Sequence, residues 1–278
     1  MKVCICTIAK QENKYVREFV EHYKNYGVDK IFLYDNNDQN DEKYEFILQD
    51  YIQNNFVEII NYRGKIRPQL QSYKNCYKNN YKKYNWLAFY DIDEFIHLKK
   101  FQNIKLFLNQ KKFDKCQKIQ LNWVFHTDNN LVYFDNRTLS ERFPYRKKSE
   151  IGKKIGGGKA IKSIMRGNIT TNISDVHYLS RQLLTCDGFG RIKESKMVTN
   201  ISDLYYFYLD HYYCKSTEEF IEKIMKTDGV FNLTNRGQNL KLNVYFSINE
   251  ITKEKLDLIE KKTKLNLSRF KKIKKIKY

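Results

Sequence analysis

Three carboxylates follow an apolar and aromatic segment within four residues, and they are the strongest chemical signal in the chain. Residues 86–96 read W-L-A-F-Y-D-I-D-E-F-I. Like charges a few ångströms apart repel and each loses hydration on burial, so these acids are expected where a buried strand leaves its sheet. Alternation along the strand puts Asp91 and Asp93 on one side, and paired hard oxygen donors suit Mn2+ or Mg2+. We therefore predict a metal site at Asp91 and Asp93 that phosphate oxygens of a ligand complete; the alternative is a strand end with solvated acids.

The segments around this cluster alternate between strand and helix patterns. Short apolar runs predict buried strands, and apolar residues at helical spacing predict helices between them. The expected strands are 3–8, 28–34, 56–62 and 86–90, and the expected helices are 12–26 and a segment that starts at Pro68. This order predicts an α/β fold with a mostly parallel central sheet and helices on both faces, which binds ligands beyond the carboxyl ends of its strands. Polar clusters fall at those ends, at 7–12, 35–38 and 91–94.

A second chemical signal surrounds His211. Residues 216–219 read S-T-E-E, the pattern of a helix capping box, and Lys215 precedes them. The first turn of a helix attracts anions because its N–H groups are unpaired, so Lys215 and Ser216 are candidate phosphate ligands. His211 is a candidate metal ligand, and the alternative is a packed histidine beside tyrosines.

The stretch 126–159 has no regular periodicity and carries Asp128 and Glu141. Long irregular segments inside an enzyme domain commonly carry specificity. Glycines 156–158 precede Lys159, but residue 160 is alanine, so the pattern of a nucleoside-triphosphate loop fails and a hinge or turn is predicted. Further strands are predicted at 118–125, at 159–165 and in the segment that enters Asp175-Val176-His177.

The length of the chain and its net charge limit the domains and the kinds of partner that we expect. The 278 residues predict a catalytic domain at 1–247 and a basic amphipathic helical tail at 248–278. Lys and Arg total 51 against 32 Asp and Glu, and the resulting net charge of +19 favours phosphate-bearing partners: nucleic acid, an anionic membrane or a nucleotide-linked substrate. Nine basic residues of 261–278 are interleaved with apolar ones, so this segment is either a membrane-surface helix or a solvated tail.

The cysteines and the apolar runs predict a location. Six cysteines lie scattered, without a Cys-x-x-Cys pattern, in a chain too large to need disulfides; they are Cys4, Cys6, Cys76, Cys116, Cys186 and Cys214. They are expected to be reduced. The N-terminal apolar run is too short for a signal peptide, and no run approaches the roughly 18 apolar residues of a membrane span. We expect a cytoplasmic protein, soluble or peripheral at the inner face of the membrane.

Four ordered blocks of the sequence carry a resemblance to a known family. They are C-T-I-A-K-Q-E-N at 6–13, the segment from Glu18 to Asn37 with Y-D-N-N at 34–37, the run 86–96 ending D-I-D-E-F, and H-Y at 211–212 followed by Lys215-Ser216. Together they resemble nucleotide-sugar glycosyltransferases of the family-2-like and family-92 kind. Two positions depart from the family pattern: His126 stands where a glycine is usual, and Gln11 stands in a block commonly written Lys-Asn-Glu.

The resemblance implies a Rossmann-like fold of the GT-A type with a helical C-terminal appendage, in which 1–98 is the nucleotide-binding half and 99–247 the acceptor half. It implies an inverting hexosyltransferase that uses Mn2+ or Mg2+ and moves a galactose- or glucose-type sugar from a UDP-sugar to a glycan or lipid-linked acceptor of surface polysaccharide biosynthesis. The residues that it assigns to nucleotide-sugar binding are Thr7, Lys10, Glu12, Asp35, Asn37, Asp91, Lys215 and Ser216. Metal ligation falls to Asp91, Asp93 and His211, with His177 as the substitute for His211. The catalytic base is left open among Asp128, Glu141 and Asp175.

Two other classes of function compete with this reading. A metal-dependent nucleic-acid-processing enzyme would concentrate basic residues around Asp91 and Asp93, whereas the densest basic run is 261–278. No nucleic-acid partner is therefore expected. A non-catalytic binding protein would show no metal-dependent affinity for a nucleotide.

Overall fold

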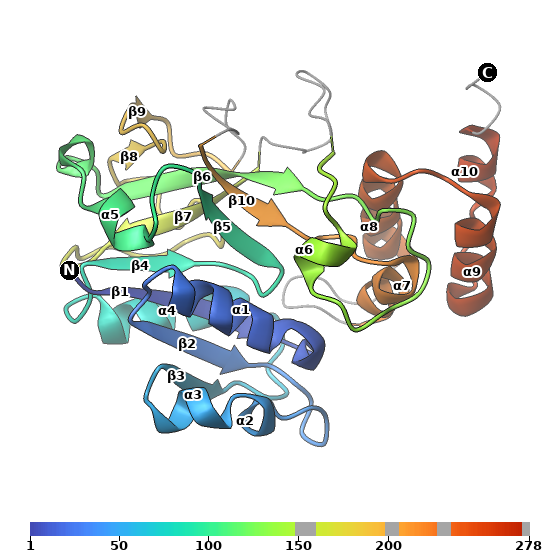
Figure 1. Cartoon of the computed structure of the whole chain (residues 1–278), viewed down its shortest axis with the longest axis horizontal. Coiled ribbons are helices and arrows are strands. Elements are labelled where there is room, and N and C mark those ends of the chain that lie inside the picture. The colour runs from blue at the N-terminus through green and yellow to red at the C-terminus, as the bar shows by residue number, and fades with distance from the viewer. Residues whose placement is uncertain (148–159, 198–205, 227–234, 274–278) are drawn as a thin grey trace. The chain divides into compact units, whose positions relative to one another are not determined.

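The computed structural model describes residues 1–147, 160–197, 206–226 and 235–273. Its chain divides into two compact units (Figure 1). The first contains Met1–Val124 and Gly158–His211, and the second contains Phe125–Gly157 and Tyr212–Tyr278. These limits do not coincide with the predicted ones at 98/99 and 247/248, because the helices Thr217–Met225 and Asn235–Ile248 belong with the C-terminal helices. The glycines 156–158 and Lys159, predicted as a turn, lie outside the described residues.

The first unit opens with the predicted parallel sheet. Strands β1 (Val3–Ala9), β2 (Lys30–Asp35), β3 (Val57–Asn61) and β4 (Trp86–Phe89) lie in the order β3-β2-β1-β4, all parallel. The helices between them are α1 (Asn13–Asn25), α2 (Tyr44–Ile47), α3 (Gln49–Gln53) and α4 (Gln69–Asn80). The chain adds β2 and β3 on one side of β1 and then returns to add β4 on the other side. Parallel sheets with this change of direction bind ligands at the carboxyl ends of their strands. The Rossmann-like α/β prediction is confirmed.

Helices cover both faces of this sheet. On one face, Tyr73 and Cys76 of α4 pack against Cys6 of β1 in a buried cluster. On the other face, Tyr23 of α1 stacks on Tyr90 with ring centroids 5.7 Å apart. Strands buried on both sides need no polar alternation, which explains why β1, β2 and β4 read as nearly continuous apolar runs.

The remaining strands of the unit are mostly antiparallel. Among the described residues, one sheet holds ten strands, and its path continues from β4 through β7 (Ile161–Arg166), β6 (Lys118–Phe125), β10 (Phe207–His211) and β5 (Glu94–Leu98). The β4–β7, β6–β7 and β5–β10 pairs are antiparallel, so the parallel arrangement predicted from the sequence is the one that β3, β2, β1 and β4 form. The short strands β8 (Thr185–Cys186) and β9 (Ile192–Lys193), the helix α5 (Ile104–Leu108) and the 3-10 helix η1 (Lys111–Phe113) complete the unit. The strand predicted before Asp175 is wrong, because 169–184 has no regular secondary structure.

The second unit is helical. It contains α6 (Leu139–Arg142), α7 (Thr217–Met225), α8 (Asn235–Ile248), α9 (Lys253–Thr263) and α10 (Ser268–Ile273). Phe220 of α7 stacks on Tyr245 of α8 at 4.2 Å, and Phe246 of α8 meets Phe270 of α10 at 4.5 Å. No described helix is both long enough and apolar enough to cross a bilayer.

The packing of α10 corrects the predicted membrane surface. Leu267 is fully buried and Phe270 is 4% exposed, so two of the apolar residues assigned to a membrane-facing side lie inside the second unit. A side chain that already packs on protein is not available to a bilayer. The side chains of Ile273 and Ile276 lie outside the described residues.

One pair of cysteines corrects the prediction of reduced thiols. Cys116 and Cys186 form a disulfide, whereas Cys4, Cys6, Cys76 and Cys214 are buried and are not part of a disulfide. The bond follows from a strand pairing that the sequence pattern does not predict. Strand β8 runs parallel to β6 and brings Cys186 beside Ile119. Disulfides persist mainly in oxidising compartments, so the cysteines no longer argue for the cytoplasm.

Loss of this disulfide should destabilise the protein measurably. The bond closes a loop with a sequence separation of 70 residues, and constraining such a loop in the unfolded chain is worth about 2–4 kcal/mol. We expect the Cys116→Ser/Cys186→Ser variant to lose about that much free energy of unfolding in a urea titration. A reductant should lower the stability of the wild type and leave the double variant unchanged; equal insensitivity of both would show that the bond does not form.

Candidate active site

The acidic cluster lies where β4 leaves the sheet, as predicted. Tyr90 is buried, residues 91–93 form a turn, and β5 begins at Glu94. Two hydrogen bonds close the turn: the Glu94 N–H donates to the Asp91 carbonyl at 3.0 Å, and the Asp91 N–H donates to Glu94 Oε2 at 3.0 Å. Glu94 is fully buried and therefore acts on the turn rather than on a ligand.

Asp91 is held by three side chains from two elements. Its Oδ1 accepts hydrogen bonds from Gln69 Nε2 at 2.8 Å and from the Tyr73 hydroxyl at 3.1 Å, both on α4. Its Oδ2 lies 2.9 Å from Lys162 Nζ on β7. The side chain remains 32% exposed, so it can still meet a ligand from its open side.

Lys162 is the residue of this site that the sequence reasoning missed. It is fully buried, and its ammonium lies 3.7 Å from Glu94 Oε2 in addition to its contact with Asp91. Burial by itself would lower the pKa of Lys162, but Asp91 and Glu94 outweigh that effect and raise it. Burial also raises the pKa of Glu94 well above its ordinary value, and Lys162 opposes that rise. The available signal was a lysine inside the apolar run 160–165.

Asp93 and His211 form a second pair. Asp93 Oδ1 lies 3.4 Å from His211 Nε2, and their side chains are 12% and 5% exposed. The antiparallel register sets His211 of β10 opposite Glu94 of β5, which places it next to the turn. The Trp123 ring packs on His211 with centroids 4.4 Å apart.

The predicted three-ligand metal set is only partly assembled. Strand alternation does not orient Asp91 and Asp93, because both lie in the turn, and they contact different partners. Both oxygens of Asp91 are engaged, and Lys162 would repel a second cation there. Within the described residues, no three His, Cys, Asp or Glu side chains gather in a way that could hold a metal ion. Asp93 and His211 offer one carboxylate and one imidazole, so a divalent cation held by them would need its other ligands from a bound molecule and water.

His177, the substitute ligand, also packs against Trp123. Its ring centroid is 5.4 Å from that of Trp123, and its Nδ1 is 3.3 Å from the Ile161 carbonyl. Burial, and secondly the charge of Lys162, lowers the pKa of His177 to about 4. It is therefore neutral at pH 7. Asp175 Oδ1 accepts hydrogen bonds from the backbone N–H groups of His177 and Tyr178, at 2.7 and 3.0 Å, and fixes this loop.

The predicted nucleoside-binding residues gather at the ends of β1 and β2. Ala9 pairs with Asp35 in the register, and Asn37 Oδ1 accepts a hydrogen bond from the Gln11 N–H at 2.6 Å. Lys10 lies 3.0 Å from Asp38. Thr7 is fully buried in β1, and Glu12 precedes α1, where its carbonyl accepts the first backbone hydrogen bonds of the helix.

Asp35 is tied into this cluster by Arg63, which the sequence reasoning also missed. The carboxylate is 1% exposed, accepts the Asn37 N–H at 2.9 Å and lies 2.7 Å from Arg63. Burial raises the pKa of Asp35, and the hydrogen bond from Asn37 and the charge of Arg63 oppose that rise. Asp35 therefore holds the loop in place, and the partly exposed Lys10 and Glu12 are the members of the cluster that a ligand can reach.

The candidates in the second unit have structural partners. Asp128 is 1% exposed, accepts a hydrogen bond from the Tyr245 hydroxyl at 2.7 Å and pairs with Lys255 at 2.7 Å. Glu141 closes the capping box of α6. Ser216 is fully buried and caps α7.

Lys215 is 8% exposed at a left-handed backbone position with φ of 53°. The predicted phosphate site at Lys215 and Ser216 is therefore buried as the chain stands. Of the three candidate bases, Asp175 is the one that shares a unit with Asp91 and Asp93.

An α/β sheet with an acidic turn and a histidine at the end of its strands is the arrangement that the resemblance to GT-A glycosyltransferases predicted. The sequence profile of glycosyltransferase family 92 matches residues 1–257, and the chain belongs to this family.

The curated relatives are longer than the shared segment. A family 92 protein of Ricinus communis is 27% identical over 97 residues, which cover 35% of this chain and 17% of the relative. One from Oryza sativa subsp. japonica is 26% identical over 95 residues, or 34% of this chain and 16% of the relative. Among solved structures, S. aureus TarS 1-349 aligns at 8% identity with a TM-score of 0.41, over 88% of this chain and 71% of the TarS chain. HddC from Yersinia pseudotuberculosis aligns at 14% identity with a TM-score of 0.35, over 59% of this chain and 76% of HddC.

Substitution of Lys162 tests how much its charge contributes to the stability of the protein. We expect Lys162→Met to destabilise the protein by about 3–5 kcal/mol, because Asp91 and Glu94 would lose their shared counter-charge. Adding Glu94→Gln to that variant should recover part of the loss, since one buried carboxylate is then gone. Urea titrations of the single and double variants measure both values, and a loss below about 1 kcal/mol for Lys162→Met would contradict the assigned role.

Proposed function

We propose that this chain transfers a hexose from a UDP-sugar to a hydroxyl group of a glycan or lipid-linked acceptor. The observation that carries the proposal is the pairing of Asp93 with His211 beside the anchored Asp91, at the end of a parallel sheet, in a chain of glycosyltransferase family 92. The curated relatives extend well beyond the matched segment, so donor, acceptor and pathway are all part of the proposal.

Asp93 and His211 would hold Mn2+ or Mg2+, and the cation when bound would neutralise charge on the departing diphosphate. This revises the expected ligand set. Asp91, fixed by Lys162 and α4, would instead use the open side of its carboxylate to bind the donor ribose or a metal-bound water.

Direct displacement at the anomeric carbon inverts its configuration. The acceptor oxygen forms the new bond to carbon, the bond from carbon to the UDP oxygen breaks, and a carboxylate takes the acceptor proton. We propose Asp175 for this role over Asp128 and Glu141. Its Oδ1 is fixed by two backbone N–H groups, while no hydrogen bond to its Oδ2 occurs among the described residues.

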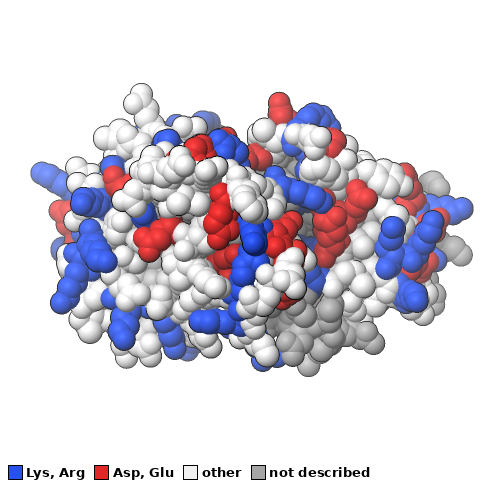
Figure 2. All heavy atoms as spheres, turned by 90° about the horizontal axis from the view of Figure 1, so that it is seen from below, with Lys and Arg blue, Asp and Glu red and all other residues white. Residues whose placement is uncertain are grey.

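The distribution of charge supports a small nucleotide ligand over a nucleic acid. On the face shown in Figure 2, acidic and basic side chains are intermixed. A protein that tracks a nucleic-acid backbone needs a continuous basic surface.

Contact with an anionic membrane remains a prediction, but the interaction that we propose for it is different. Since Leu267 and Phe270 are buried, we propose that the exposed lysines of 261–271 provide an electrostatic attraction without an inserted apolar face. A location at the inner face of the membrane also remains a prediction, without support from the cysteines.

Substitution of the proposed cation ligands tests the function. We expect Asp93→Asn and His211→Gln each to lower Mn2+-dependent release of UDP from a UDP-hexose by at least about 100-fold, because each substitution removes one of the two side chains proposed to bind the cation. The exposed Asp114→Asn in the same unit is the matched control and should keep wild-type turnover.

The donor is found first, by thermal shifts with UDP, GDP and CMP sugars with and without Mn2+, since a ligand that binds only the native state raises the melting temperature. Wild-type turnover in Asp93→Asn, with unchanged dependence on Mn2+, would refute the proposed site.

A further inference from the structure

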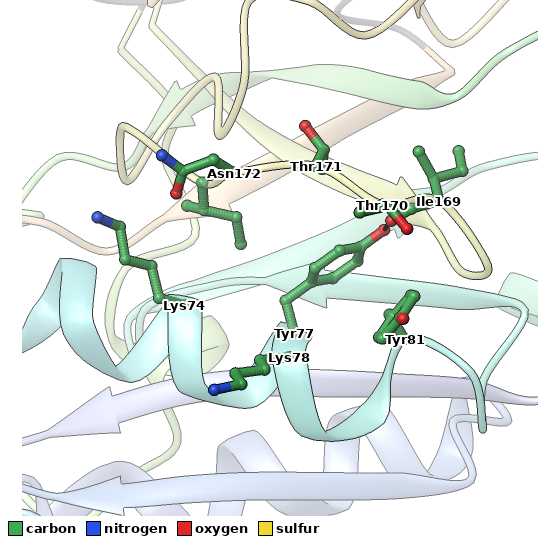
Figure 3. A pocket seen from close by; sticks show the side chains of 9 residues that line it. Lys74, Tyr77, Lys78, Tyr81, Ile169, Thr170, Thr171 and Asn172 are labelled. Atoms are coloured by element: carbon green, nitrogen blue, oxygen red, sulfur yellow. Dashed lines mark hydrogen bonds between the residues drawn. The ribbon is translucent and has the colours of Figure 1, made fainter.

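A cavity of about 560 Å³ lies between α4 and the segment that follows β7 (Figure 3). Its volume falls in the range of small-molecule sites. One wall is the outward side of α4, from Lys74 to Tyr81, and the other is the segment Ile169–Ile173. None of the residues assigned to nucleotide or metal binding lines it.

Two tyrosine rings give the cavity an aromatic surface. Tyr77 is 4% exposed, and its hydroxyl donates to the carbonyls of Arg166 and Ile169 at 3.0 and 2.7 Å. Because the hydroxyl is engaged, Tyr77 offers a ligand its ring. Tyr81 directly follows the last residue of α4, and its ring centroid lies 5.5 Å from that of Tyr77. Ile173 adds a buried apolar contact. Flat apolar rings of this kind can pack against the C–H face of a sugar.

The rim is polar and positively charged. Lys74 and Lys78 are exposed one helical turn apart, and neither forms an ion pair with any described residue. Thr170 and Asn172 stand on the opposite wall, where they offer a hydroxyl and an amide (Figure 3). Hydrogen-bonding groups on one wall and ammonium groups on the other suit a ligand that carries both hydroxyls and an anionic group.

The two segments that line the cavity also carry residues of the candidate active site. The first turns of α4 carry Gln69 and Tyr73, which hold Asp91. On the opposite wall, Asp175 and His177 follow Ile173 within four residues of the sequence. The cavity is therefore built on the same two segments that carry the groups proposed to react.

We propose that this cavity binds an anionic saccharide: the part of the acceptor, bearing phosphate or carboxylate, that extends away from the reacting hydroxyl. The inference rests on the proposed function for the identity of the ligand as an acceptor. The cavity itself is tested by binding, which needs no turnover.

The test measures binding of glucose 6-phosphate and of uncharged glucose to the full chain by ligand-observed NMR, with and without saturating UDP. Glucose 6-phosphate should bind at least about tenfold more tightly than glucose, and saturating UDP should not displace it. Lys74→Ala/Lys78→Ala should weaken its binding about five- to tenfold, since each exposed ion pair is worth up to about 1 kcal/mol. Tyr81→Ala should weaken binding of both sugars.

The control is Lys83→Ala/Lys115→Ala, which removes the same charge from exposed positions of the same unit. Equal weakening by the control would show general attraction to a basic protein and overturn the proposal. Displacement by UDP would assign the sugar phosphate to the donor site and overturn it as well, as would no binding at all. If glucose 6-phosphate binds as expected but no UDP-sugar is turned over, the proposed function fails while the cavity stands; turnover without such binding rejects only the cavity.

Discussion

The buried ammonium of Lys162 between Asp91 and Glu94 is the interaction on which the site depends. Two carboxylates of one tight turn would repel each other in a desolvated position, and the turn would open toward water. Lys162 supplies the opposite charge from a strand that joins β4 on its far side from β1. The antiparallel half of the sheet is therefore part of the site, since β7 carries the ammonium that pairs with Asp91 and Glu94.

The Lys162 ammonium also gives Asp91 and Asp93 different surroundings. Asp91 is held by Gln69, Tyr73 and Lys162 and has a fixed orientation. Asp93 turns to His211 instead. A sequence pattern with two aspartates thus yields one residue held by a buried ammonium and one that contacts a histidine, a distinction that the spacing alone does not contain.

The local parts of this arrangement were predictable from the sequence, and the long-range parts were not. The apolar run before Asp91 fixed the end of β4, and the alternation of strand and helix patterns fixed the parallel half of the sheet. Lys162, Arg63 and the partner of Cys116 depend on pairings between distant segments, which leave no periodic signature. Asp128 and Glu141 were reasonable candidates by type, but a carboxylate is also the usual partner of a buried lysine or a helix cap.

The helix α4 contributes to both the candidate active site and the cavity. One of its sides packs on the sheet, and the other side lines the cavity. The inward Tyr73 reaches Asp91, while Lys74, the next residue, faces the cavity. Since the helix is anchored in the buried cluster by Tyr73, Cys76 and Tyr77, its two sides cannot shift independently. A ligand in the cavity would therefore contact the same helix that orients Asp91.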